Sequence, residues 1–149
     1  MSEVGNSIKS LVSSQKHGVL AVTDRQTRIP YGALVNYACN HKGLPIFLFS
    51  ALARHTQALT VDPASSLLVS ELPPDGDVLT GMRASIMGQC VRLGQDQAAK
   101  DAYLAWHPYA AGYAEFGDFS FWRLEPTLIH TVAGFGRIAT LPAAEVFGV

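Results

Sequence analysis

Cysteine is scarce in this sequence. Only Cys39 and Cys90 occur among the 149 residues. Both lie in apolar runs typical of strands, so we expect buried free thiols and no disulfide. The five histidines are far apart and have no zinc-type spacing with the cysteines. A structural metal site is therefore not expected.

Charge is also scarce. Charged residues make up 15% of the sequence, and 11 basic against 12 acidic residues give a formal net charge of −1. Without a basic run, neither nucleic acid nor an anionic membrane is expected as a partner. No apolar run approaches the roughly 20 residues that span a bilayer, and the first residues lack the order of a signal peptide. We expect a cytoplasmic protein.

Hydrophobic residues, in contrast, make up 48% of the sequence. This fraction indicates a compact globular chain and argues against disorder. The length fits one domain with a full core, so residues 1–149 are predicted to form a single domain.

Short apolar runs between polar turns predict a mainly β protein. Strands are expected over residues 18–23, 31–39, 44–49, 65–72, 80–93, 118–124 and 127–132. Helices are expected over residues 4–14, from a cap at Asp96 to Trp106, and as a last turn over 142–147. Because most connections have hairpin length, we predict a six- to seven-stranded antiparallel barrel with peripheral helices.

The stretch 44–70 is predicted to be central. Two apolar runs flank a short helical segment that carries Arg54, His55 and Thr56. Ser50 can cap this helix, and a helix start with two basic side chains suits a phosphate. The alternative is that Arg54 and His55 only solvate an exposed turn. Gly32 and Ala33 lack bulk, which would let a flat ligand approach the backbone, although the pattern by itself favours a bend or bulge in the strand.

Several segments together resemble one known family. They are residues 30–37, 49–59, 62–68, 103–108, 118–126 and 133–137. In this order they resemble the FMN-binding split barrel of the pyridoxamine 5′-phosphate oxidase-like superfamily. The strand motif Trp122-Arg-Leu-Glu-Pro126 and the loop Gly134-Phe135-Gly136-Arg137 resemble its short branch, which is related to bacterial haem-utilisation proteins.

The resemblance implies an FMN site between the two chains of a homodimer. The implied cofactor-binding residues are Gly32, Ala33, Leu34, Phe49, Ser50, Arg54, His55, Thr56 and Arg83. The flavin ring would lie along Gly32, Ala33 and Leu34 and against Phe49. The phosphate would meet Ser50, Arg54, His55 and Thr56. Arg83 would stabilise negative charge on the reduced ring. The alternative for Arg83 is a salt bridge across the dimer interface.

The leading hypothesis is a homodimeric FMN-dependent oxidoreductase that acts on a small molecule which the sequence does not identify, with no evident catalytic acid or base. A second hypothesis is a haem-binding or haem-degrading module, with His107 or His130 as axial ligand. A third is a dimer without enzymatic activity that keeps only the barrel. A deazaflavin such as F420 needs the same flat slot and anion site as FMN.

Overall fold

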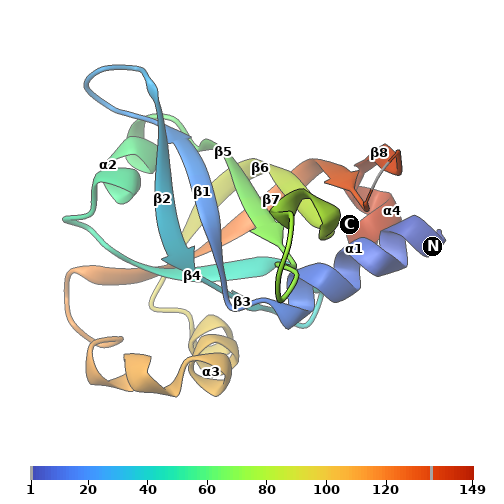
Figure 1. Cartoon of the computed structure of the whole chain (residues 1–149). Coiled ribbons are helices and arrows are strands. Elements are labelled where there is room, and N and C mark those ends of the chain that lie inside the picture. Colours follow the sequence, from blue (N-terminus) through green and yellow to red (C-terminus); the bar gives the residue numbers. More distant parts are fainter. Residues whose placement is uncertain (1, 135) are drawn as a thin grey trace.

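The computed structural model describes residues 2–134 and 136–149 and is mainly β (Figure 1). Its strands are β1 (His17–Thr23), β2 (Pro30–Asn36), β3 (Ala38–Cys39), β4 (Pro45–Ser50), β5 (Ala64–Ser70), β6 (Arg83–Gly94), β7 (Phe119–Val132) and β8 (Ile138–Pro142). Its helices are α1 (Glu3–Ser14), α2 (Arg54–Val61), α3 (Gln97–Trp106) and α4 (Ala143–Phe147), with short 3-10 turns η1 (Val78–Thr80) and η2 (Pro108–Gly112).

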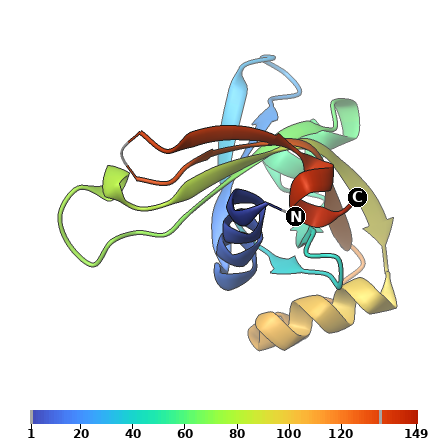
Figure 2. The same ribbon diagram turned by 90° about the vertical axis from the view of Figure 1, so that its right-hand side faces the viewer.

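The described strands form one antiparallel sheet. Their order is β2-β1-β5-β6-β7-β4-β3, and β8 pairs with β7 outside this path. The sheet curls into a half-barrel. As a result, β2 and β4 are in contact although they are far apart in this order. Helices α1 and α4 lie side by side, and the connection that carries η1 projects away from the barrel (Figure 2).

Two hydrophobic clusters hold the fold together. The larger fills the barrel and receives the apolar face of α1, which contributes Ile8, Leu11 and Val12. The smaller lies beneath α3 and joins Tyr103 to Phe121 and neighbouring side chains. Strand β4 is buried over its first five residues and contributes to both clusters. It is therefore the element that connects the barrel to α3.

The helices follow the sequence pattern. The expected helix over residues 4–14 is confirmed as α1, and Ser2 caps it by accepting the Gly5 N–H at 3.0 Å. Asp96 caps α3 as predicted, with its carboxylate 2.8 Å from the Ala99 nitrogen. The last helical turn is present as α4. These ends are set by local sequence, which is why the pattern located them.

The break expected between strands 118–124 and 127–132 was wrong, because both belong to β7. Pro126 cannot donate a ladder hydrogen bond, but it pairs with Gly88 of β6 at a shift of register that absorbs it. A Cβ atom on Gly88 would lie 2.0 Å from the backbone oxygen of Glu125. Glycine at 88 is thus what allows β7 to pass through Pro126 unbroken.

Other strand boundaries also needed correction. The strand expected over 31–39 divides at Tyr37, whose hydroxyl donates to the backbone oxygen of Val12. Strand β6 begins at Arg83 because residues 78–80 form η1. Strand β8 was not predicted. It forms by pairing with the last residues of β7. Phe135 of the predicted loop motif lies outside the described residues.

Both cysteines are free thiols. Cys90 is buried as predicted, and burial raises its pKa to about 11. Cys39 is only half-buried by its neighbours, and burial raises its pKa to about 12. Neither thiol is activated as a nucleophile.

Candidate functional site

Ser50 ends β4 just before the turn to α2, and the prediction that it caps α2 is wrong. Ser50 does not cap α2, because residues 51–53 intervene; its hydroxyl instead accepts the Leu52 N–H at 3.1 Å and donates to Asp118 at 3.0 Å. The residue at the cap position is Ala53, which has no side chain that could accept a hydrogen bond. The backbone N–H groups of residues 54–56 consequently have no partner among the described residues.

Arg54 lies at the exposed start of α2. Its Nε donates to Oδ1 of Asp24 at 2.6 Å, and its guanidinium lies 5.8 Å from the centre of the Tyr31 ring. Asp24 is only 4% exposed. The hydrogen bond from Arg54, followed by those from Thr27, holds the pKa of Asp24 well below its usual value. The Asp24 carboxylate therefore fixes Arg54 beside the unpaired N–H groups.

His55 turns inward, unlike Arg54. Its ring meets that of Phe49 edge-on at 4.4 Å, and its Nε2 is buried without a hydrogen-bond partner among the described residues. Burial lowers its pKa below the usual value, so the ring is neutral at neutral pH. Thr56 and Trp122 likewise carry a buried polar atom without a partner, and the Trp122 ring lies 6.2 Å from Phe49. Unpaired buried polar groups of this kind are uncommon in folded proteins, so a bound ligand or a water molecule is expected to pair with them.

A cavity of about 370 Å³ opens beside these residues. Its walls come from β2, β4, the start of α2 and the segment from α3 to β7, and include Leu34, Phe49, His55, Tyr103, Tyr113 and Phe119. We call this cavity the aromatic slot. The rings of Tyr113 and Phe119 are 5.1 Å apart. An apolar, ring-lined wall next to free N–H donors suits a flat molecule with an anionic end.

The structure brings together only some of the predicted site residues. Leu34, Phe49, Ser50 and His55 line the aromatic slot, and Arg54 lies beside it in a smaller pocket.

The other predicted site residues do not line the aromatic slot. Because side chains alternate along a strand, Ala33 points into the barrel core, whereas Gly32 and Leu34 face outward. Thr56 is buried. Arg83 donates to the backbone oxygens of Leu79 and Gly81 at the far end of β5 from α2, so it does not reach this slot within one chain.

The segment from α3 to β7 supplies the residues that sequence reasoning missed. Tyr103 lies within the helix predicted up to Trp106, but neither Tyr103 nor Tyr113 nor Phe119 was considered for the site. The aromatic residues at 103, 109, 113, 116 and 119 were a usable signal. Aromatic rings spaced through a turn-rich connection often form the wall of a binding cavity.

Of the two histidines considered as haem ligands, His107 uses both ring nitrogens in hydrogen bonds and His130 uses one. His107 is completely buried, and its ring nitrogens lie 2.6 Å from the Tyr109 hydroxyl and 2.6 Å from the Tyr37 backbone oxygen. It therefore has no nitrogen to offer without breaking a buried hydrogen bond. Nδ1 of His130 lies 2.9 Å from the Thr140 hydroxyl, on the outer face of the sheet.

The family model described as "CREG, beta-barrel" matches residues 2–147. The chain belongs to the CREG beta-barrel family. This places it in the FMN-binding split-barrel superfamily, as its sequence motifs indicated. The helices in residues 2–134 and 136–149 are all too short or too polar to traverse a lipid bilayer.

Proteins similar to this chain include some that are named for haem. The chain is 38% identical over 130 residues to the non-canonical haem oxygenase HOZ of Arabidopsis thaliana, a chloroplastic protein; the match covers 85% of the chain and 39% of HOZ. The chain thus spans about two-fifths of the length of this relative.

Solved structures agree on the fold. A haem-binding protein from Mycobacterium smegmatis has a TM-score of 0.91 at 25% identity, over 99% of this chain and 61% of that one. The haem storage protein HutZ from Vibrio cholerae has a TM-score of 0.65 at 23% identity, over 80% of this chain and 87% of that one. The second likeness supports the fold alone.

Proposed function

We propose that this chain binds haem in the aromatic slot. The observation that carries the proposal is a neutral, half-buried imidazole with an unpaired Nε2, that of His55, in the wall of a ring-lined cavity. The names of HOZ and of the mycobacterial haem-binding protein support it.

The residues present fit haem at both ends of the slot. Phe49, Tyr113 and Phe119 offer apolar surface to a porphyrin. Arg54 and the free N–H groups at the start of α2 would hold a propionate. His55 would supply a ring nitrogen to the iron, because a neutral imidazole is the form that ligates metals. Its Nε2 is buried in the structure, so the ring would have to turn toward the slot to do so. When bound, haem supplies an iron centre that can be reduced and can bind oxygen.

The outer sheet face supports a homodimer. Leu34, Val19 and Leu68 are register partners across β2, β1 and β5, and they are 75%, 40% and 43% exposed. Paired residues on neighbouring strands share a face, so these side chains form one apolar surface. Leu34 also lines the slot. We propose that a second copy of the chain covers this face and closes the slot at the subunit interface.

The oligomeric state tests this part of the proposal. Leu68→Asp places a charge on this apolar face, and we expect a monomer in sedimentation equilibrium where the native chain is a dimer. Val61→Asp is the matched control, because Val61 is similarly exposed at the end of α2. A native chain that sediments as a monomer would reject the dimer.

FMN is the second candidate. The specific observation in its favour is the uncapped start of α2, since three unpaired N–H groups and Arg54 suit a compact phosphate. The ring would lie against Phe49 and the outward side of Gly32 and Leu34. An oxidoreductase activity would then rest on the flavin, with the protein supplying position and electrostatics. A cytoplasmic location stays a prediction for either cofactor.

Parallel titrations decide between the two. Haemin is added while the Soret band is recorded, and FMN is added while flavin fluorescence is recorded. We expect a shifted Soret band at one haem per chain, lost or displaced in His55→Gln and retained in His41→Gln. Arg54→Gln should weaken binding, whereas Arg28→Gln should not, because Arg28 pairs with Asp62 at the other end of α2.

Each outcome has a clear meaning. A folded native chain that leaves the Soret band of free haemin unchanged rejects the haem proposal. Quenching of FMN fluorescence in the same chain would then favour the flavoprotein. Haem cleavage, for which HOZ is named, is tested by following decay of the Soret band after a reductant is added.

A further inference from the structure

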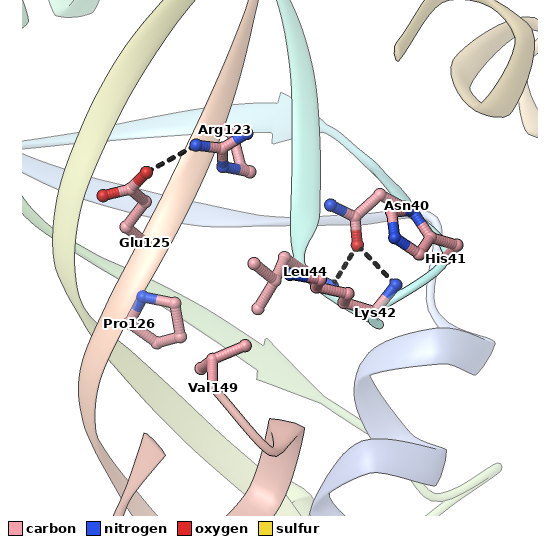
Figure 3. Close-up of a pocket in the computed structure, with 8 residues that line it drawn as sticks. All are labelled: Asn40, His41, Lys42, Leu44, Arg123, Glu125, Pro126 and Val149. Carbon is pink, nitrogen blue, oxygen red and sulfur yellow. Dashed lines mark hydrogen bonds and ion pairs between the residues drawn. The ribbon is translucent and has the colours of Figure 1, made fainter. Parts of the chain in front are cut away.

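A second cavity lies at the opposite end of β4 from the aromatic slot (Figure 3). Its volume is about 420 Å³, within the range of small-molecule sites. Its principal lining residues are His41, Lys42, Leu44, Arg123, Glu125 and Pro126. We call it the basic cavity. Leu44 lines the basic cavity and Leu48 is the first residue of β4 that lines the slot, so four steps of about 3.3 Å along the strand separate the two by roughly 13 Å.

The turn between β3 and β4 forms one wall and is rigid. The side-chain oxygen of Asn40 accepts the N–H groups of Lys42 at 2.9 Å and Leu44 at 3.0 Å. Backbone hydrogen bonds from Asn40 to Leu44 and from Gly43 to Asn40 close the same turn, and Gly43 has a φ of +86°. The backbone beneath His41 and Lys42 is thus already ordered, so less entropy is lost when they bind a ligand.

Arg123 of β7 forms the facing wall. One terminal nitrogen of its guanidinium donates to Glu125, while its remaining N–H groups have no partner among the described residues. Lys42 takes part in none of the ion pairs that the described residues form. Two cationic side chains and a histidine therefore face one carboxylate side chain, in a chain whose formal net charge is −1.

The floor between these walls is apolar. Leu44 is buried, Pro126 comes from β7, and Val149 extends from the end of α4 toward both (Figure 3). Two cations on opposite walls above an apolar floor match a molecule with an anionic group at one end of a compact apolar body. With only two cations and no basic run beside them, the cavity does not suit a polyanion.

We propose that the basic cavity is a binding site for a small organic anion, a phosphate monoester or a carboxylate joined to a compact apolar body. Lys42 and Arg123 bind the anionic group, and Leu44 and Pro126 contact the apolar body. Glu125 limits affinity, because it occupies one donor of Arg123 and repels the ligand. This site does not depend on haem or FMN.

The test uses phenyl phosphate and benzoate as probes, added to the full chain labelled with ¹⁵N. We expect saturable shifts of the amide signals of residues 40–44 and 123–125, with inorganic phosphate binding more weakly because it lacks the apolar body. Lys42→Gln and Arg123→Gln should each weaken binding about tenfold, since each removes a charge-assisted contact. Glu125→Gln should strengthen it.

The control is Lys100→Gln, because Lys100 pairs with Glu115 away from the cavity. Equal weakening in this control, or equal binding of inorganic phosphate, would identify an adventitious ion only. Absence of saturable shifts with either organic probe would overturn the proposal. Shifts that follow the concentration of the protein instead of the probe would also overturn it, since they would show that a second copy occupies the cavity.

Discussion

Replacing His107 tests whether this residue supports the wall of the slot or binds haem. His107 lies between α3 and η2, and its ring is 4.8 Å from that of Tyr103. Since the Tyr37 oxygen can only accept, Nε2 of His107 carries the hydrogen, and Nδ1 accepts from the Tyr109 hydroxyl. The residue thus ties the wall of the aromatic slot to the segment between β2 and β3.

His107→Leu keeps a similar volume and removes both ring nitrogens. The hydroxyl of Tyr109 can turn to water because Tyr109 is exposed, but the buried Tyr37 oxygen loses its partner. Leaving a buried acceptor unpaired costs about 1–3 kcal/mol. For a domain of about this size each kcal/mol lowers the melting temperature by roughly 2–4 °C, so a fall of about 2–12 °C is expected.

Thermal unfolding by circular dichroism measures this fall, and the exposed His41→Leu serves as the control. The Soret band on adding haemin should persist in His107→Leu, because the structure gives that residue no free nitrogen. A variant that melts with the native chain and has lost the band would refute the reasoning and make His107 the ligand.

Three further predictions concern stability. The lowered pKa of His55 means that the unfolded chain binds more protons below about pH 6.5, so the free energy of unfolding should fall as the pH drops from 7 to 5, and less so in His55→Gln. The lowered pKa of Asp24 should add a separate loss below about pH 4, measured by the same denaturant titrations and reduced in Asp24→Asn. Gly88→Ala should destabilise the chain by at least about 1–3 kcal/mol because its Cβ meets the Glu125 backbone, whereas Gly117→Ala, with open space around it, should not.

The sequence predicted what local residues decide. Asp96 marked the start of α3, and the apolar spacing of Ile8, Leu11 and Val12 marked α1. The position of Arg54 at the start of a helix after a buried strand was also visible, and with it one end of the slot. Each of these features depends on contacts within a few residues along the chain.

What the sequence could not show depends on distant partners. Asp24 fixes Arg54 across a sequence separation of 30 residues, and nothing near Asp24 indicates that pairing. Ser50 was wrongly predicted to cap α2, because its hydroxyl bonds instead to the Leu52 N–H and to Asp118, which is 68 residues away. Pro126 was taken as a strand end, since its tolerance depends on Gly88 in another strand.

The separation of the two hydrophobic clusters has an evolutionary consequence. Tyr103 and Phe121 of the cluster beneath α3 pack apart from the cluster that fills the barrel. As long as the hydrogen bond from His107 to Tyr37 is kept, the segment between β6 and β7, which provides one wall of the slot, can therefore change in length and composition while the barrel remains stable. Related proteins could therefore differ in this segment and accommodate different cofactors on the same barrel. A designer could likewise transfer the segment from one related protein to another as a unit.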